Sequence, residues 1–551
     1  MTRYVIHDYE TFGKDTRKDR ASQFAAVVTD EEFNIIEKHE FFCKPMLDNL
    51  PSPEACYVTG VTPLDIIHYQ KNPEKTVLSE YEFFHRINDI FSVDRSCVFG
   101  YNNVRFDDEM SRHGFYRNAI APYDREFKNG CSRMDMITMV RMFAFLYPDE
   151  INTKNEAGEV SFKLSDLATA NNFKMEHAHD AFSDVETTLE LAKFMRNKHP
   201  DFWNFWANRN NKKEVQKILD NHLKTTPFLP ILAHSTYFGK NNQYFKPVVC
   251  LGRQSSNPKD PDYANYICIE IENVEQLEKL FSLPVEKVKS LLFAKKEERE
   301  QEGIDFSIPI HTIKTNQLPV FITPDMMNVD NMPFKFDVPS VKSFIKESRP
   351  EFKEVCEYIR NNYSNIKSYI LEVVSNKKEF DPCIDSDLGL YSSEIDLFKD
   401  DNVKQWMAHL NYNISMKKMI GYFNGEFYNH EPLLEQFAKR LILRNFMSEL
   451  KEECRAANNG SLWKSIIDDW KQECADKIRN GYVTNKKRPL FMQNVLSINE
   501  EQFLNTLKEY AESDDTLKQK IAKDLTEYHA KLVSFFPQNK PEENSTRKIN
   551  P

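Results

Sequence analysis

Residues 4–13 read YVIHDYETFG, a short apolar stretch that carries two acids. Its β-branched and aromatic residues predict a strand. Because successive side chains of a strand point to opposite faces, Asp8 and Glu10 are expected on the same face. Paired carboxylates are ligands of the kind that bind Mg²⁺ or Mn²⁺, and two such ions about 4 Å apart commonly catalyse phosphodiester cleavage. The alternative is that the two acids mark only a solvated strand end.

A second acidic motif, GYNNVRFDDE, occupies residues 100–109 and overlaps the strand pattern CVFGYN. Asp107 follows an aromatic residue and stands four positions after Asn103, so it is a candidate third ligand. Its neighbour Asp108 is the obvious competitor. Both acids could instead stabilise the positive end of a helix that begins near Asp107.

A third motif, HAHDAFSDVETTLELAKF, occupies residues 177–194 and runs into an amphipathic helical pattern. Asp184 lies five positions after His179. A histidine beside a metal-bound acid can deprotonate the attacking water, since its ordinary pKa is about 6.5. His177 and Asp180 remain alternatives for these two roles.

The patterning predicts three folding units and a tail, in a chain of 551 residues. Residues 1–200 alternate between strand and helix patterns, which favours an α/β unit around one sheet. Residues 201–350 contain short apolar stretches typical of a small β-rich unit. Long amphipathic helices dominate residues 351–535. Residues 536–551 are polar and aperiodic, which predicts a disordered tail.

The bulk composition excludes several classes of protein. A formal net charge of −11 is unlike that of a protein coated in basic surface, so any contact with nucleic acid must be local. The ten cysteines show no zinc spacing and stand in a chain far larger than most disulfide-stapled scaffolds, which favours a reducing compartment. No signal peptide and no apolar run of about 18 residues is found, so a cytoplasmic protein is expected.

Together, in this order, the three motifs resemble the signature of the DnaQ-like 3′→5′ exonucleases, in the group named DEDDh. Four sequence motifs are similar to those of the bacterial exodeoxyribonuclease I family: HDYETFG, DRASQFAAVVTD, GYNNVRFDDE and HAHDAFSDV. The resemblance covers residues 3 to about 480 and implies a ribonuclease H-like α/β nuclease domain, an SH3-like β-rich domain and an all-α C-terminal domain. It also implies a monomer that degrades single-stranded DNA processively and releases 5′-mononucleotides.

The resemblance assigns roles to individual residues. Two Mg²⁺ ions, which Mn²⁺ can replace, would be bound by Asp8, Glu10, Asp107 and Asp184, with His179 as the general base. Glu10 would also contact the terminal nucleotide. Lys163 stands where the family is expected to have arginine, which keeps the charge but loses the bidentate fork. Competing hypotheses are an RNA or proofreading exonuclease of the same fold, and an inert nucleic-acid-binding protein.

A basic and aromatic segment between Arg112 and Arg141 is a candidate channel for a single strand, because cations can follow phosphates while rings stack on bases. The alternative is a solvated helix whose arginines lie over a core of aromatics. The resemblance favours DNA contact by Arg112, Tyr123, Phe127 and Arg141. It also suggests that the acidic tail of single-stranded DNA-binding protein binds the surface cations Lys439, Arg440 and Arg444.

Overall fold

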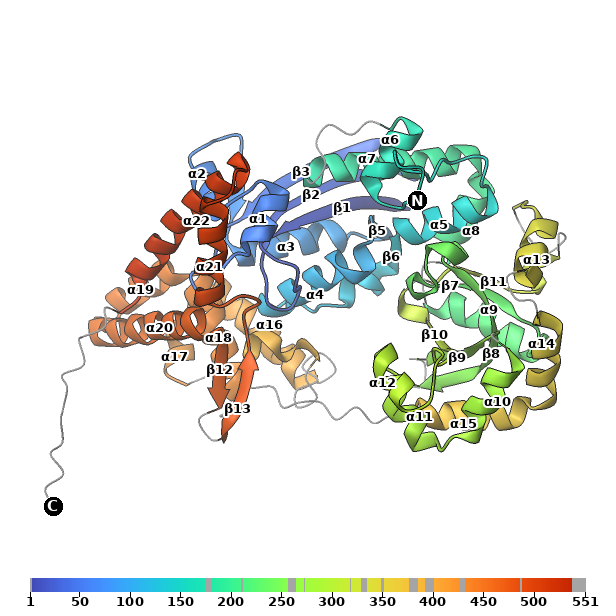
Figure 1. Cartoon of the computed structure of the whole chain (residues 1–551). Helices are drawn as coiled ribbons and strands as arrows, with labels where there is room; N and C mark the ends of the chain where they lie inside the picture. Colours follow the sequence, from blue (N-terminus) through green and yellow to red (C-terminus); the bar gives the residue numbers. More distant parts are fainter. Residues whose placement is uncertain are drawn as a thin grey trace, which may run out of the picture.

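The computed structural model describes residues 2–173, 180–209, 212–255, 264–271, 273–317, 319–328, 334–347, 351–375, 385–391, 401–425, 432–485 and 488–537. These residues form three units, and the first lies between the other two (Figure 1). Within these ranges no helix combines the length and the hydropathy that a membrane span requires. The cysteines described are all free thiols. Nearly all of the predicted tail lies outside the described residues.

The first unit is built on a six-stranded mixed sheet in the order β4-β3-β2-β1-β5-β6. β1 is central and pairs antiparallel with β2 and parallel with β5. Every residue of β2 is buried, because helices pack on both faces of the sheet. This confirms the predicted α/β unit. The strands are β1 Arg3–Thr11, β2 Ala21–Thr29, β3 Ile35–Cys43, β4 Val77–Leu78, β5 Ser96–Gly100 and β6 Ser132–Asp135.

Two groups of helices cover this sheet. α3 and α4 pack on one face, and α5, α7 and α8 pack on the other. The helices of this part of the chain are α1 Pro53–Thr59, α2 Pro63–Tyr69, α3 Glu80–Phe91, α4 Asp107–Arg117, α5 Met136–Leu146, α6 Leu164–Asn171, α7 Ala181–Lys198, α8 Pro200–Ala207 and α9 Lys212–Thr225. Short 3₁₀ turns are η1 Asn103–Arg105, η2 Asp124–Glu126 and η3 Lys128–Gly130.

The second unit is built on a five-stranded antiparallel sheet in the order β10-β9-β8-β7-β11. Its strands are β7 Ile231–His234, β8 Phe245–Ser255, β9 Ala264–Glu270, β10 Ile310–Lys314 and β11 Phe321–Ile322. Helices surround this sheet, and α14 and α15 pack directly on β8 and β9. The helices are α10 Val274–Ser282, α11 Val285–Leu291, α12 Lys296–Gln301, α13 Val338–Glu347, α14 Phe352–Asn361 and α15 Tyr363–Val373, and 3₁₀ turns are η4 Thr236–Phe238, η5 Lys240–Asn242, η6 Thr315–Gln317 and η7 Asp325–Met327.

The third unit is mainly helical but contains a hairpin, so the expectation of an all-α unit is wrong in this detail. β12 Tyr482–Asn485 pairs antiparallel with β13 Arg488–Asn494. Tyr482, Val483 and Thr484 are residues that favour a strand. The strand was not predicted because it is short and lies between two long helical patterns. The helices are α16 Asp401–Ser415, α17 Ile420–Phe423, α18 Pro432–Asn445, α19 Met447–Ala456, α20 Gly460–Asn480, α21 Glu500–Ala511 and α22 Thr516–Phe535, with the 3₁₀ turn η9 Ser386–Tyr391.

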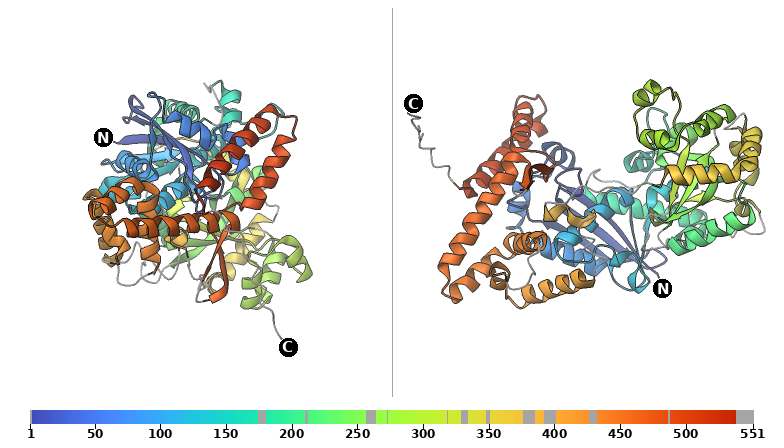
Figure 2. Two further views of the ribbon diagram at one scale, coloured as in Figure 1. Left: turned by 90° about the vertical axis from the view of Figure 1, so that its left-hand side faces the viewer. Right: turned by 90° about the horizontal axis from the view of Figure 1, so that it is seen from below.

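The first unit shares apolar cores with both of its neighbours. β5 and β6 belong to one buried cluster with β7 and β11 of the second unit. Phe12, Phe42 and Tyr116 belong to another with α18, α20 and α22 of the third unit. Both flanking units are thus packed against the first unit at opposite ends of its sheet, which Figure 2 shows from two further directions.

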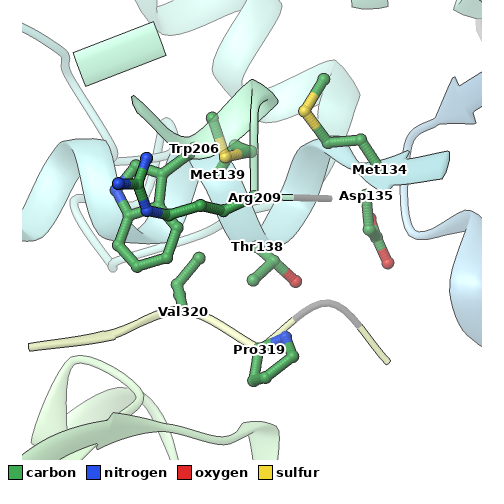
Figure 3. A pocket seen from close by; sticks show the side chains of 8 residues that line it. All are labelled: Met134, Asp135, Thr138, Met139, Trp206, Arg209, Pro319 and Val320. Carbon is green, nitrogen blue, oxygen red and sulfur yellow. The ribbon is translucent and has the colours of Figure 1, made fainter. Parts of the chain in front are cut away.

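A small cavity lies at the seam between the first and second units. Its volume is about 20 Å³, and its lining residues come from β6, α5, α8, Arg209 just after α8, and the segment before β11. Figure 3 shows Thr138 and Met139 facing Pro319 and Val320 across it. A buried water requires about 10–15 Å³, so this space has room for about one water and is too small for a nucleotide.

Asp19 joins the loop that follows β1 to the third unit. Its carboxylate is fully buried, accepts the backbone N–H of Asp15 at 2.9 Å and accepts the hydroxyl of Ser497. Gly13 is required beside it, because a Cβ at that position would lie 2.0 Å from Asp19 Oδ2. Burial raises the pKa of Asp19 from 3.8 to about 6.

We expect the variant Asp19→Asn to be more stable than the wild type at pH 7. A carboxyl whose pKa is raised on folding loses stability as pH rises from its unfolded pKa to its folded pKa, here between pH 3.8 and about 6. Asparagine fits the same hydrogen-bonding site and does not ionise. Thermal unfolding from pH 4 to pH 7 should show the advantage of the variant growing with pH. An advantage that stays constant over this window would contradict the prediction, and Asp124→Asn, whose side chain is 40% exposed, is the control.

Candidate active site

β1 presents its two acids on one face, as its period predicts. Asp8 and Glu10 are half-buried on this face, whereas the rings of His7 and Tyr9 pack among Phe24 and other aromatics on the opposite face. Asp8 lies beside Ala25 of β2 in the sheet register.

α4 brings Asp107 to the same place and turns Asp108 away from it. Asp107 is buried, and its carboxylate accepts the backbone N–H of Tyr9, which lies between the two acids of β1, at 3.2 Å. Asp108 instead accepts a 2.7 Å bond from Arg125 and a short bond from Arg133. Neither aspartate caps the helix, because the residue at the N-cap is Phe106. Of the two, Asp107 faces the carboxylates of β1.

α7 supplies Asp184, which is half-buried in the first turn of that helix. Asp180 is the N-cap of the helix: it accepts the backbone N–H of Ser183 at 3.3 Å and the amide of Gln23 at 3.2 Å. This gives Asp180 a structural role in fixing α7 against β2. His179 and His177, the predicted base and its alternative, lie outside the described residues.

The carboxylates are close enough to raise one another's pKa. Burial raises the pKa of Asp8 well above its usual value, and Asp107, Glu10 and Asp184 raise it further. Burial, followed by Asp184 and Asp107, raises the pKa of Glu10 to about 9. The pKa of Asp107 is also raised well above its usual value, first by burial and then by Asp108. The site therefore concentrates negative charge that favours a bound cation.

The arginines around Asp108, on the other side of α4, lower the pKa of this carboxyl, whereas the pKa of Asp107 is raised. Burial alone would raise the pKa of Asp108, but Arg133 and Arg125 hold it well below its usual range. Asp108 is therefore an ionised partner in a buried ion-pair network. The two adjacent aspartates thus have pKa shifts of opposite sign and different roles.

A divalent cation fits the chemistry of this donor set. In the part of the chain that the structure describes, no group of three or more His, Cys, Asp and Glu side chains is already arranged to hold a metal ion. However, Asp8, Glu10, Asp107 and Asp184 offer oxygen ligands from three elements, and their mutual repulsion favours a bound positive charge. Mg²⁺ accepts carboxylate oxygens together with several waters.

The segment between Arg112 and Arg141 does not have the free positive charge that the sequence suggested. Arg112 binds Glu126 through two bonds of 2.8 and 3.0 Å and also pairs with Glu109. Arg117 pairs with Glu80, while Arg125 and Arg133 hold Asp108. These four arginines are buried and paired with acids. They are therefore neither free cations nor the arginines of a solvated helix, which was the alternative that the sequence offered.

The other predicted DNA contacts have varied surroundings. Tyr123 is half-buried with its ring centroid 5.3 Å from the Arg112 guanidinium, whereas Phe127 is 64% exposed. Arg141 is largely buried, and its guanidinium lies 3.9 Å from the ring centroid of Tyr244 in the second unit. Lys163 is exposed at the N-cap of α6.

The structure does not show the expected basic surface on α18, because the described cations of this helix that were predicted to form it are buried or paired with acids. Arg440 is 1% exposed and pairs with Asp385 and Glu473, and Arg444 is buried against Asp48 and Asp387. Lys439, about one-third exposed, pairs with Glu435. Most of these acidic partners are distant in the sequence. The local sequence of a helix rich in cations therefore predicts a basic surface that the structure does not have.

Sequence reasoning missed the groups that position the carboxylates. The hydroxyls of Tyr9 and Ser111 lie 2.9 Å apart and join β1 to α4 behind the site. Gln23 joins β2 to Asp180 at the start of α7. A polar residue inside a continuous apolar strand, such as Gln23 in ASQFAAVVT, was the available signal.

The carboxylate centre on this sheet, together with a match of residues 5–192 to the Exonuclease family model, places the chain among the exonucleases. Residues 210–359 match the Exonuclease I SH3-like domain. Exodeoxyribonuclease I of Buchnera aphidicola subsp. Schizaphis graminum is 31% identical over 458 residues, which cover 82% of this chain and 84% of that protein. The chain therefore belongs to the exodeoxyribonuclease I family.

Solved structures agree with the fold. The structure of a moderately thermophilic exonuclease I from Methylocaldum szegediense has a TM-score of 0.75 and 28% identity, with 97% of this chain and all of that chain covered. The zinc-bound complex of Escherichia coli ExoI with single-stranded DNA has a TM-score of 0.76 and 24% identity over the same shares. At this identity the second likeness supports the fold alone.

Proposed function

We propose that this exonuclease hydrolyses single-stranded DNA from its 3′ end and releases 5′-mononucleotides. The observation that carries the proposal is the convergence of Asp8, Glu10 and Asp107, from β1 and α4, with Asp184 from α7. The name of the Buchnera relative, exodeoxyribonuclease I, supports DNA as the substrate. An RNA or proofreading exonuclease would use the same acids and is the alternative that the assay below tests.

Asp8, Glu10, Asp107 and Asp184 would hold two Mg²⁺ ions. When bound, these ions stabilise the charge on the attacking and leaving oxygens of an in-line displacement. Tyr9 fixes Asp107 through its backbone N–H, and Asp180 fixes the start of α7, so both orient carboxylates. We assign the removal of a proton from water to His179 on the motif and the family resemblance. Glu10 lies on the same face and is proposed to contact the terminal nucleotide as well.

Lys163, Arg141, Tyr123 and Phe127 remain proposed DNA contacts, whereas Arg112 is assigned a structural role because two glutamates occupy its guanidinium. Lys163 and Phe127 are exposed and available to a strand. Binding of single-stranded DNA-binding protein and a monomeric state are expectations from the family. The buried Arg440 and Arg444 do not support α18 as the surface for that partner.

We also propose that the flanking units make degradation processive, because they are packed at opposite ends of the nuclease sheet. The boundary between the second and third units is proposed near residue 375 instead of residue 350, since α14 and α15 pack on β8 and β9. Deleting residues 351–551 would expose Phe12, Phe42 and Tyr116. Processivity is better measured on the full chain, with excess unlabelled strand added as a trap.

The proposed substrate and direction are tested with one oligonucleotide sequence prepared as single-stranded DNA, duplex DNA and RNA. With Mg²⁺, 3′-labelled single-stranded DNA should release its labelled mononucleotide at once, and 5′-labelled DNA should shorten progressively. EDTA and the variant Asp8→Asn should each abolish the release. Faster release from duplex DNA or RNA, or activity that survives EDTA, would contradict the proposal.

A further inference from the structure

Tyr237 has an unusual position for an aromatic residue of a folded unit. Its side chain is 88% exposed, whereas the next residue, Phe238, is buried in the core shared with the first unit. The two belong to the short turn η4, whose N-cap Ser235 accepts the backbone N–H of Tyr237 at 3.3 Å. The anchored turn therefore holds the ring of Tyr237 in solvent on a fixed backbone.

Arg105 of the first unit meets this turn. Its guanidinium donates to the hydroxyl of Thr236 at 2.5 Å and lies 5.6 Å from the ring centroid of Tyr237. Arg105 is exposed and closes η1, two residues before Asp107. Because two residues span at most about 7 Å of backbone, the Arg105 side chain links Tyr237 to the segment that leads directly into Asp107.

A second pair of the same kind stands on this seam. Arg141 stacks on Tyr244 of the second unit at 3.9 Å and lies 5.5 Å from the ring centroid of Phe162. Tyr244 has a backbone φ of +64°, a left-handed conformation that is strained for an aromatic residue. Strained residues of this kind cluster at ligand-binding sites. The seam between the first and second units therefore combines cations of the first unit with aromatic rings of the second.

We propose that Tyr237 and Arg105 form a base-stacking subsite for the part of a single strand that lies on the 5′ side of the scissile bond. This inference rests on the proposed function. The open ring of Tyr237 stacks on an unpaired base, and the guanidinium of Arg105 neutralises the adjoining phosphate. A base paired in a duplex has no free face for this contact, so the subsite favours single strands. It is distinct from the predicted contacts at Tyr123 and Phe127.

The test is the variant Tyr237→Ala, with Tyr237→Trp as the conservative variant. Because stacking on one aromatic side chain contributes about 1–3 kcal/mol per base, the alanine variant should raise KM for a single-stranded oligonucleotide at least about fivefold. Its kcat at saturating strand should stay close to the wild-type value, because no reacting atom is touched. The tryptophan variant should restore KM. Phe293→Ala is the matched control, since Phe293 is an aromatic of the same unit that is 93% exposed.

A binding measurement adds a readout that does not depend on turnover. Oligonucleotides with one 2-aminopurine at successive positions from the 3′ end are bound in Ca²⁺ without cleavage. The wild type and the tryptophan variant should quench the probe at one particular position, and the alanine variant should not. Equal KM and equal quenching in wild type and alanine variant would overturn the subsite. A wild type without activity on single-stranded DNA would instead overturn the proposed function.

Discussion

Asparagine at position 107 is expected to lower kcat by about a thousandfold or more while leaving the protein at least as stable as the wild type. Asp107 is a proposed metal ligand, and a metal ion contributes several kcal/mol to the stabilisation of a phosphoryl-transfer transition state. Each 1.36 kcal/mol corresponds to a tenfold change in rate. Stability should not fall in EDTA, because burial raises the pKa of Asp107 and its ionised form opposes folding at neutral pH.

The neighbouring variant Asp108→Asn is the matched control and should give the opposite pattern. This substitution would leave Arg125 and Arg133 buried without their carboxylate. Breaking a buried ion pair by removing one partner costs about 3–5 kcal/mol. Thermal unfolding in EDTA and initial rates in Mg²⁺ measure the two effects separately. If Asp107→Asn retained activity, or if it unfolded at a lower temperature than Asp108→Asn, the assignment of Asp107 as a ligand would be wrong.

Alanine at position 387 is expected to destabilise the whole chain more than any surface substitution. Asp387 is buried, and its carboxylate contacts Arg444 at 2.6 Å, Arg20 at 3.2 Å and Lys477 at 3.3 Å. Arg20 belongs to the first unit and the other two cations to the third, so the network joins the units. Arg440 of the third unit also lies 3.5 Å from this carboxylate. Leaving these four buried cations without this partner should lower the free energy of unfolding by about 3–5 kcal/mol.

The pH dependence of this effect has a definite sign. Burial alone would raise the pKa of Asp387, but Arg444, Lys477 and Arg440 hold it well below 3.8. Its stabilising contribution is therefore fully present above the unfolded pKa and is lost as pH falls through the lower, folded value. Thermal unfolding of Asp387→Ala and wild type should differ by a constant amount from pH 5 to pH 8, and the difference should shrink below pH 4.

Asp124→Asn is the control for this network, because Asp124 and its partner Lys128 are 40% and 58% exposed. Exposed pairs contribute about 0–1 kcal/mol, so this variant should unfold close to the wild type. Equal loss of stability in Asp387→Ala and Asp124→Asn would show that the buried network does not hold the first and third units together.

Features that depend on short-range periodicity and on the order of motifs were predictable from the amino-acid sequence. The strand period placed Asp8 and Glu10 on one face, and the structure confirms this. The alternation of strand and helix patterns within residues 1–200 predicted the α/β unit. The amino-acid sequences of the motifs predicted the exodeoxyribonuclease I family. A short strand pair within a helical region, β12 and β13, has too few residues to stand out from helical patterns on both sides.

Which of the two adjacent acids faces the site, and which partners the arginines bind, became known from the three-dimensional structure. Asp107 and Asp108 have the same side chain and the same local sequence, but α4 turns one toward β1 and the other toward Arg125 and Arg133. The partners of Arg444 lie 396 and 57 positions away, at Asp48 and Asp387. Local sequence therefore does not show whether a charged side chain is exposed or buried. Burial and ion pairing depend on partners that are distant in the sequence and meet only in the packed chain.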